Sequence, residues 1–180
     1  MIPNLSTNRT TLREFVESDW EQVHKYASQK EVCQFQPWGP NTEYDTKEFV
    51  GTILVDQKKN NRTRFAFAII EKEANELIGS IEFNIRDEQN RIGEIGYIIH
   101  PSYWRMGFAT EATKEIISFG FKKFKLHRVY ATCDVRNIGS AKVLEKCGLT
   151  LEGKMREDLL LRDGWRDTFL YSILEHEWSN

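Results

Sequence analysis

Short runs of strand-forming residues recur along the chain, separated by polar turn residues. Residues 10–15 alternate between polar and apolar side chains, which is the two-residue period of a strand with one buried face. Polar residues at 73–76 and 87–90 separate three longer runs and predict tight turns. We therefore expect strands over residues 10–15, 64–71, 77–86 and 91–99, the last three forming a meander.

Helices are indicated by start signals and by apolar residues at helical spacing. A Ser-Asp pair at residues 18–19 can cap a helix to about residue 27, and Asn41 or Thr42 can cap a second helix to about residue 58. Residues 35–40 contain two prolines and a glycine, which predicts a loop carrying Trp38. Further along, we expect a helix that Thr110 and Glu111 open, a strand over 128–135, a helix to Lys146, and strands over 149–160 and 165–174 joined at Asp163–Gly164.

This order of elements predicts a mixed α/β fold. We expect a largely antiparallel central sheet of about six to seven strands with helices on both faces. The 180 residues are 40% hydrophobic and contain only four prolines, which suits a single domain over residues 1–180.

Composition and charge restrict the class of partner. The formal net charge is −2, from 25 Lys and Arg against 27 Asp and Glu, which argues against a nucleic-acid binder that works by neutralising phosphates. The N-terminal residues have no basic-then-apolar signal and no apolar run approaches a membrane span, so we expect a cytoplasmic protein without membrane contact. The cysteines, Cys33, Cys133 and Cys147, lack the spacing of a zinc or redox motif and are expected to be packed thiols, with no metal site.

Residues 93–112 are the most informative segment, because a strand, a stop and a helix start follow one another there. Pro101 ends the strand, and Gly107 and Ala109 keep side-chain bulk away from the start of the next helix. The first turn of a helix has unpaired N–H groups and the positive end of the helix dipole, so this loop predicts a phosphate site. It lacks the Gly-Lys-Ser/Thr ending of a nucleoside-triphosphate loop and the three glycines of a dinucleotide fingerprint.

Three motifs carry a resemblance to a known family. Residues 104–109 resemble the pyrophosphate loop, Gln/Arg-x-x-Gly-x-Gly/Ala, of the GNAT (GCN-five-related) N-acetyltransferases. Trp104 departs at the first position, but it matches the Tyr-Trp-x-x-Gly-x-Ala-Thr-Glu-Ala form of the Rim-type ribosomal-protein N-terminal-alanine acetyltransferases. Residues 137–149 resemble Asn-x-x-Ser/Ala-x-x-x-x-Glu-Lys-x-Gly-Phe, with Leu149 in place of Phe, and residues 162–178 resemble the Rim-type C-terminus.

The resemblance implies a GNAT-like acyl-CoA N-acyltransferase fold with a splay between strands 4 and 5, which end near Ile99 and Asp134. It implies an enzyme that transfers acetyl from acetyl-CoA to a primary amine, most specifically the N-terminal α-amine of a protein or peptide. The alternatives are a small amine such as a polyamine, amino-acid derivative or aminoglycoside, and a non-catalytic acyl-CoA-binding protein. The chain is expected to be a monomer or a homodimer.

The same resemblance assigns the cofactor-binding residues. A backbone N–H near Ile98 or Ile99 would polarise the acetyl carbonyl, and the backbone of the loop would hold the pyrophosphate. Core packing for Trp104, a solvated charge for Arg105 and helix capping for Asn137 are the competing interpretations. The loop residues concerned are Trp104, Arg105, Met106, Gly107, Phe108, Ala109 and Thr110, followed by Asn137 and Ser140.

Three chemical roles remain to be assigned. Many relatives place a thiolate-protonating tyrosine where this chain has Leu144, so Ser140 is the better candidate, with helix capping as its alternative. Glu94 is the candidate general base, against the interpretation of an edge-strand charge facing solvent. The fallback bases are Asp134, Glu157 and His100, and the candidate walls of the acceptor pocket are Trp38, Tyr97 and Tyr171, the two tyrosines with core packing as the alternative.

Overall fold

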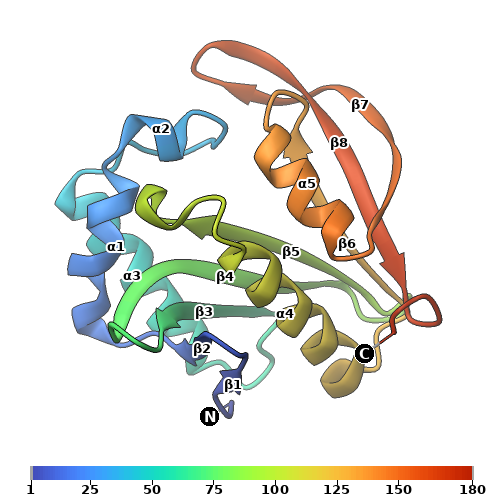
Figure 1. The fold of residues 1–180 in the computed structure, drawn as a ribbon, viewed down its shortest axis with the longest axis horizontal. Helices are drawn as coiled ribbons and strands as arrows, with labels where there is room; N and C mark the ends of the chain where they lie inside the picture. Colours follow the sequence, from blue (N-terminus) through green and yellow to red (C-terminus); the bar gives the residue numbers. More distant parts are fainter. Residues whose placement is uncertain (1, 180) are drawn as a thin grey trace.

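A computed structural model describes residues 2–179, which build an eight-stranded sheet in the order β1-β2-β3-β4-β5-β6-β8-β7 (Figure 1). Every neighbouring pair of strands is antiparallel except β5 and β6, which are parallel. The strands are β1 (Leu5–Ser6), β2 (Thr10–Glu14), β3 (Arg64–Glu71), β4 (Glu76–Asp87), β5 (Ile92–Ile99), β6 (Arg128–Asp134), β7 (Thr150–Leu161) and β8 (Gly164–Leu174).

Helices cover both faces of this sheet, as predicted (Figure 1). On one face, α1 (Trp20–Ala27) and α3 (Glu43–Gln57) pack against Ala66, Ala68 and Ile70 of β3. On the other face, α4 (Phe108–Phe124) and α5 (Ile138–Lys146) pack against residues of β3 to β6 and β8. The remaining short elements are α2 (Lys30–Cys33) and the 3-10 turns η1 (Glu17–Asp19) and η2 (Pro101–Tyr103).

Most predicted elements are confirmed, with differences at short or exposed segments. The sheet exceeds the expected six to seven strands because β1 has only two residues, too few to leave a periodic pattern. The one-turn helix α2 and the turn η2 were missed for the same reason. Thr42 caps α3 as predicted, since its Oγ1 accepts a hydrogen bond from the N–H of Asp45 at 3.2 Å and the Asp45 carboxylate accepts from the N–H of Thr42 at 2.8 Å.

An aromatic cluster holds α4 against the sheet. Phe119 and Phe124 of α4 lie over Phe65 and Phe83, with ring centroids 4.8–6.4 Å apart. Gly120 allows this close approach, because a Cβ there would lie 2.6 Å from the Phe83 ring. The packing fixes the axis of α4 and therefore the place at which its N-terminus meets the end of β5.

The sheet opens between β5 and β6. These strands pair only over Ile92–Glu94 and Arg128–Tyr130, whereas β5 stays paired with β4 as far as Ile99 and β6 stays paired with β8 as far as Asp134. The strands therefore diverge beyond Glu94 and Tyr130. Counted from β2 as the first strand, this is the splay that was expected between strands 4 and 5.

Candidate functional site

The loop between β5 and α4 presents a turn of open backbone beside this splay. Trp104 is anchored by its indole, whose Nε1 donates to the Ile99 carbonyl at 2.7 Å, while 41% of the residue is exposed. The structure therefore does not support the interpretation of Trp104 as a core residue. Gly107 has φ +86° and caps α4, so the helix begins at Phe108, two residues before the predicted start.

The backbone donors of this loop are unused within the described chain. From Arg105 to Thr110, no N–H group donates to another described residue, and the first one that does is Glu111, which bonds to the Gly107 carbonyl at 3.0 Å. Arg105 and Gly107 are exposed and Met106 is 53% exposed. Six free N–H groups at an exposed helix N-terminus fit the diphosphate of a coenzyme A.

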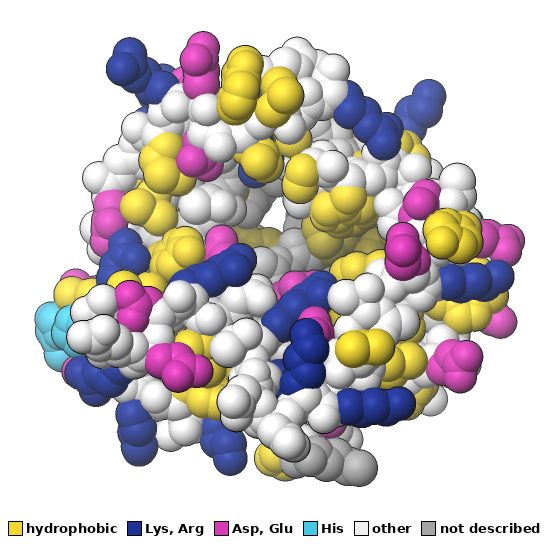
Figure 2. Space-filling model, turned by 180° about the vertical axis from the view of Figure 1, so that it is seen from behind, with side chains coloured by type: hydrophobic (Ala, Val, Ile, Leu, Met, Phe, Trp, Pro, Cys, Tyr) yellow, Lys and Arg dark blue, Asp and Glu magenta, His cyan; other side chains and the backbone are white. Residues whose placement is uncertain are grey.

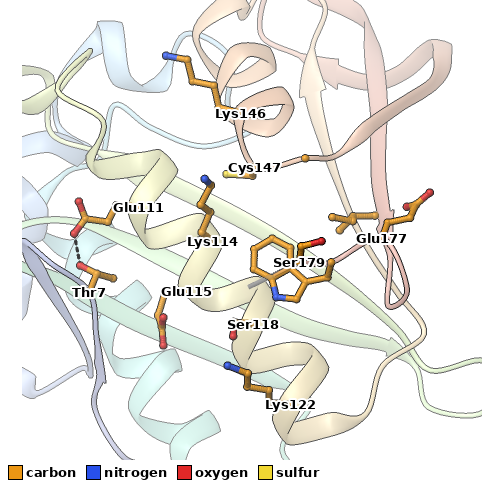
Figure 3. A pocket seen from close by; sticks show the side chains of 13 residues that line it. Thr7, Glu111, Lys114, Glu115, Ser118, Lys122, Lys146, Cys147, Glu177 and Ser179 are labelled. Carbon is orange, nitrogen blue, oxygen red and sulfur yellow. Dashed lines mark hydrogen bonds between the residues drawn. The ribbon is translucent and has the colours of Figure 1, made fainter.

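Arg9 holds the loop in place through contacts that were not predicted. The Arg9 guanidinium donates from Nη1 to the Met106 carbonyl at 3.0 Å and from Nε to Glu111 at 2.9 Å, and it lies 4.4 Å from the Phe108 ring centre. Glu111 also accepts from the backbone N–H of Arg9 at 2.6 Å and from the Thr7 hydroxyl (Figure 3). Burial alone would raise the pKa of Glu111, but the hydrogen bonds from Thr7 and Arg9 outweigh it and hold that pKa below its usual value.

Two hydroxyl groups meet across the splay. The Tyr97 hydroxyl lies 2.9 Å from the Ser140 Oγ and 3.2 Å from the Ser140 carbonyl oxygen. Asn137 provides the helix cap, because its Oδ1 accepts from the N–H of Ser140 at 3.0 Å. The Ser140 hydroxyl is therefore not engaged in capping α5. Leu144 is fully buried in the core beneath the same helix.

Tyr97 and Tyr171, two of the three candidate walls of the acceptor pocket, lie on the opposite face of the sheet from Trp38. Tyr171 lies in the core under α4 and α5 and Tyr97 is partly buried against that core, whereas Ile98 and Trp38 pack against the α1–α3 cluster on the opposite side. Tyr171 is 2% exposed, and burial together with its hydrogen bond to Glu145 raises its pKa to about 12. Core packing, the alternative given for both tyrosines, describes Tyr171, and the role of acceptor-pocket wall stays a prediction for Trp38, Tyr97 and Tyr171.

Glu94 lies where β5 and β6 begin to diverge, opposite Tyr130 in the last parallel pair. Strand alternation directs its side chain away from Tyr97 and toward the face that carries Ile98. Its carboxylate accepts from the Nε of Arg86 at 2.5 Å. Glu94 thus stays a prediction for the base, with a guanidinium partner that the sequence did not indicate.

The fallback bases occupy three different environments. The Asp134 carboxylate is fully buried and is chelated by Arg136, with N–O distances of 2.6 Å and 2.9 Å. Burial alone would raise the pKa of Asp134, but the hydrogen bonds and charge of Arg136 outweigh it and lower that pKa, which makes Asp134 a weak base. Glu157 is exposed on β7, and His100 accepts a hydrogen bond from the N–H of Ser102 at the end of β5.

The molecule is hollowed on the face opposite α4 and α5. Figure 2 shows this hollow near the centre of the back view, between the part that carries α2 and the part that carries β7 and β8, with apolar and charged side chains around it. The loop after α2 reaches toward β8 through a hydrogen bond from Arg166 to the Phe35 carbonyl. We expect an acceptor to approach the splay from this hollowed face, which is called the acceptor side below.

A second, open pocket of about 570 Å³ lies along the outer side of α4 (Figure 3). Its ionic side chains are Lys114 and Lys122 of α4, Lys146 of α5, and Glu111, Glu115 and Glu177. Within residues 2–179, no group of His, Cys, Asp and Glu has the arrangement of a metal site, and no helix is long and apolar enough to cross a membrane.

The three cysteines are free and buried, as predicted. Burial raises the pKa of Cys133 to about 11 and that of Cys147 to about 12, which keeps both thiols protonated near neutral pH.

The family model described as "Acetyltransferase (GNAT) domain" matches residues 9–150, which include the anion loop, the splay and Ser140. The chain belongs to the GNAT acetyltransferases. It is therefore an acetyl-transfer enzyme that takes its acyl group from acetyl-CoA, as the free N–H groups of the loop and the open sheet suggest. The expected GNAT-like fold is confirmed.

The similarity to known proteins extends over nearly the whole chain. An uncharacterised N-acetyltransferase of Bacillus subtilis, YnaD, is 36% identical over 176 residues, covering 98% of this chain and 99% of YnaD. A GNAT-family acetyltransferase structure from Bacillus anthracis has a TM-score of 0.85 at 34% identity, covering 97% of this chain and 99% of the other. The Microcin C7 self immunity acetyltransferase MccE, solved in complex with acetyl-CoA and AMP, has a TM-score of 0.83 at 23% identity, covering 93% of each chain.

Proposed function

We propose that this GNAT acetyltransferase acts on the N-terminal α-amine of a protein or peptide. A ribosomal-protein-serine acetyltransferase of Escherichia coli is 30% identical over 132 residues, covering 73% of this chain and 71% of that protein. A spermidine N(1)-acetyltransferase of Vibrio cholerae is 23% identical over 173 residues, covering 96% of this chain and 97% of that protein. Electrostatics of the acceptor side favours the first of these acceptors.

Carboxylates near the acceptor side are already neutralised. Glu94 is paired with Arg86, and Asp134 is paired with Arg136. Glu82 of β4, on the same face of the sheet as Glu94, is paired with Arg64 at 2.6 Å. A polyamine carries several positive charges and requires unpaired carboxylates to hold them, whereas a peptide N-terminus brings a single amine and a backbone of neutral amides. The pairing therefore supports a peptide acceptor.

The cofactor-side roles follow from the loop geometry. We assign the diphosphate to the backbone N–H groups of residues 105–110, with Gly107 leaving room for it and Arg9 holding the loop in place. Acetyl-CoA supplies the thioester, and the backbone near Ile98 and Ile99 polarises its carbonyl. Ser140 donates to the sulfur as the carbon–sulfur bond breaks, and Glu94 or a water beside it removes the proton of the ammonium.

The acetyl transfer on which this proposal rests is carried by a single observation: β5 and β6 stop pairing after Glu94 and Tyr130, beside a helix N-terminus with free donors and in front of a hollow on the opposite face. Thioester and amine can then meet inside the sheet from opposite sides. A sheet paired along the full length of both strands would block this approach.

The acceptor is tested with matched peptides. The first has a free N-terminal alanine or serine and one internal lysine, and the second is identical but acetylated at its N-terminus. We expect CoA release, followed with a thiol reagent, for the first peptide only, and mass spectrometry should place the acetyl group on the α-amine. Equal turnover of both peptides, or faster turnover of spermidine than of either, would refute the proposed acceptor.

A further inference from the structure

The direction of the hydrogen bonds between Tyr97 and Ser140 decides what the Ser140 hydroxyl can do. Tyr97 has one hydroxyl proton and two acceptors within reach, the Ser140 Oγ at 2.9 Å and the Ser140 carbonyl at 3.2 Å. If Tyr97 donates to the carbonyl, the Ser140 proton is directed at the Tyr97 oxygen. If Tyr97 donates to the Oγ, the Ser140 proton is left for a third group, which is either the Cys133 thiol, also within hydrogen-bonding reach of the Ser140 hydroxyl, or a ligand in the splay.

An approaching negative charge favours the second arrangement, in which Tyr97 donates to the Ser140 Oγ. The N–H of Ser140 is already satisfied by Asn137, so the serine hydroxyl is not drawn into the cap. A developing thiolate attracts the serine proton, and a chain of hydrogen bonds from tyrosine through serine to sulfur then strengthens each of its members. Burial raises the pKa of Tyr97, so its phenol remains a donor across the working pH range.

We propose that Tyr97 is a positioning residue, which holds the Ser140 hydroxyl so that its proton faces the departing sulfur of CoA. In the transfer, the amine nitrogen bonds to the acetyl carbon and the carbon–sulfur bond breaks, with both electrons going to sulfur. The Tyr97–Ser140 chain stabilises this negative charge without being consumed. The nitrogen loses one proton to the base or to water as the amide forms, and the thiolate takes up one proton from solvent, so that CoA leaves as the thiol and Tyr97 and Ser140 keep their own protons. This inference rests on the role proposed for Ser140, but not on the identity of the acceptor.

The first test measures the thiol of bound CoA, without turnover. The thiolate absorbance of the CoA complex is titrated from about pH 7 to about pH 11, a range that begins below the pKa of about 8.5 of a cysteine thiol and leaves room for the less acidic alkyl thiol of CoA. In Tyr97→Phe, we expect the pKa of the bound thiol to rise by about one unit, a roughly tenfold loss of thiolate stabilisation. Calorimetry should show weaker CoA binding at high pH and unchanged binding of desulfo-CoA, which has no sulfur to stabilise.

Turnover gives the second readout, with whichever amine the wild-type enzyme acetylates fastest. Tyr97→Phe should lower kcat about tenfold with KM for acetyl-CoA within about twofold, because the lost interaction forms only as sulfur becomes charged. Ser140→Ala should lower kcat at least as much. The double variant should be no slower than Ser140→Ala, since Tyr97 acts through that hydroxyl.

Tyr26→Phe is the matched control. Tyr26 is another buried tyrosine, and its hydroxyl donates to the Ser80 Oγ at 3.2 Å beneath α1. Tyr26→Phe should lower the free energy of unfolding by an amount comparable to Tyr97→Phe, because each variant loses a buried tyrosine hydroxyl. It should leave the pKa of the bound thiol unchanged. Equal weakening of CoA and desulfo-CoA binding in Tyr97→Phe, or additive kcat losses in the double variant, would reduce Tyr97 to a structural contact. Wild-type kcat in Ser140→Ala would instead overturn the role assigned to Ser140.

Discussion

Gly107 offers the sharpest test of the anion loop, because one position can separate strain from charge. We expect Gly107→Glu to abolish useful CoA binding, and Gly107→Gln to weaken it far less. Both variants place an L-residue at φ +86°, which costs about 1–2 kcal/mol in folding free energy. Both also bring a Cβ to 3.3 Å from the Arg9 Nη2, a flexible group that can shift.

Charge is the remaining difference between the two variants. A carboxylate about 6 Å from one phosphate charge, at an effective dielectric constant of about 20, raises the binding free energy by about 3 kcal/mol. This corresponds to a loss in CoA affinity on the order of a hundredfold relative to the glutamine variant. Added salt should narrow the gap, because both charges are near solvent.

Isothermal titration with CoA measures the effect, and thermal unfolding confirms that both variants are folded. Gly107→Ala serves as the control that contains the backbone strain without a long side chain. If the glutamate and glutamine variants bind CoA equally, or if salt leaves their difference unchanged, residues 105–110 do not hold the diphosphate. The observed free N–H groups would then have another purpose.

Two further predictions concern stability. Gly79→Ala should lower the free energy of unfolding by about 3 kcal/mol, because the new Cβ would lie 2.2 Å from the Ile98 carbonyl oxygen, whereas Gly96→Ala, with no atom within 4 Å, should change it by less than about 0.5 kcal/mol; urea unfolding compares them. The pKa of Asp134 is lowered by Arg136, so its contribution to stability is full above the unfolded-state pKa of about 3.9 and is lost as pH falls through the lower folded-state value. Wild-type stability should therefore fall more steeply below about pH 4 than that of Asp134→Asn, and parallel curves would contradict this role.

Local patterns sufficed to predict the order of helices and strands and an anion loop after β5, whereas the splay between β5 and β6 was implied only by the family resemblance. The α4 boundary was placed two residues late because Gly107 was interpreted only as space for a ligand, and its left-handed conformation also starts the helix. The faces of Tyr97 and Ile98 were ambiguous, since both sides of β5 are apolar at that point and alternation cannot distinguish them.

The contacts that sequence could not supply join distant segments. Arg9 and Glu111 are separated by 102 residues, and nothing in either neighbourhood marks them as partners. The arginines that neutralise Glu94 and Asp134 are closer in sequence, but their pairing depends on side-chain direction on a twisted sheet. The long-range contact and the arginine partners of the carboxylates could therefore be found only in the three-dimensional structure. The free N–H groups at a helix start, in contrast, could be predicted from the order of residues.

The parallel ladder between β5 and β6 has only three residue pairs, so we expect a bound ligand to add to the stability of the fold. Because only three residue pairs join the halves of the sheet, we expect the pantetheine arm of bound coenzyme A to bridge β5 and β6 in the way that an added strand would. A ligand that binds only the folded chain adds stability by mass action. We therefore expect the protein's resistance to unfolding to rise with the concentration of coenzyme A.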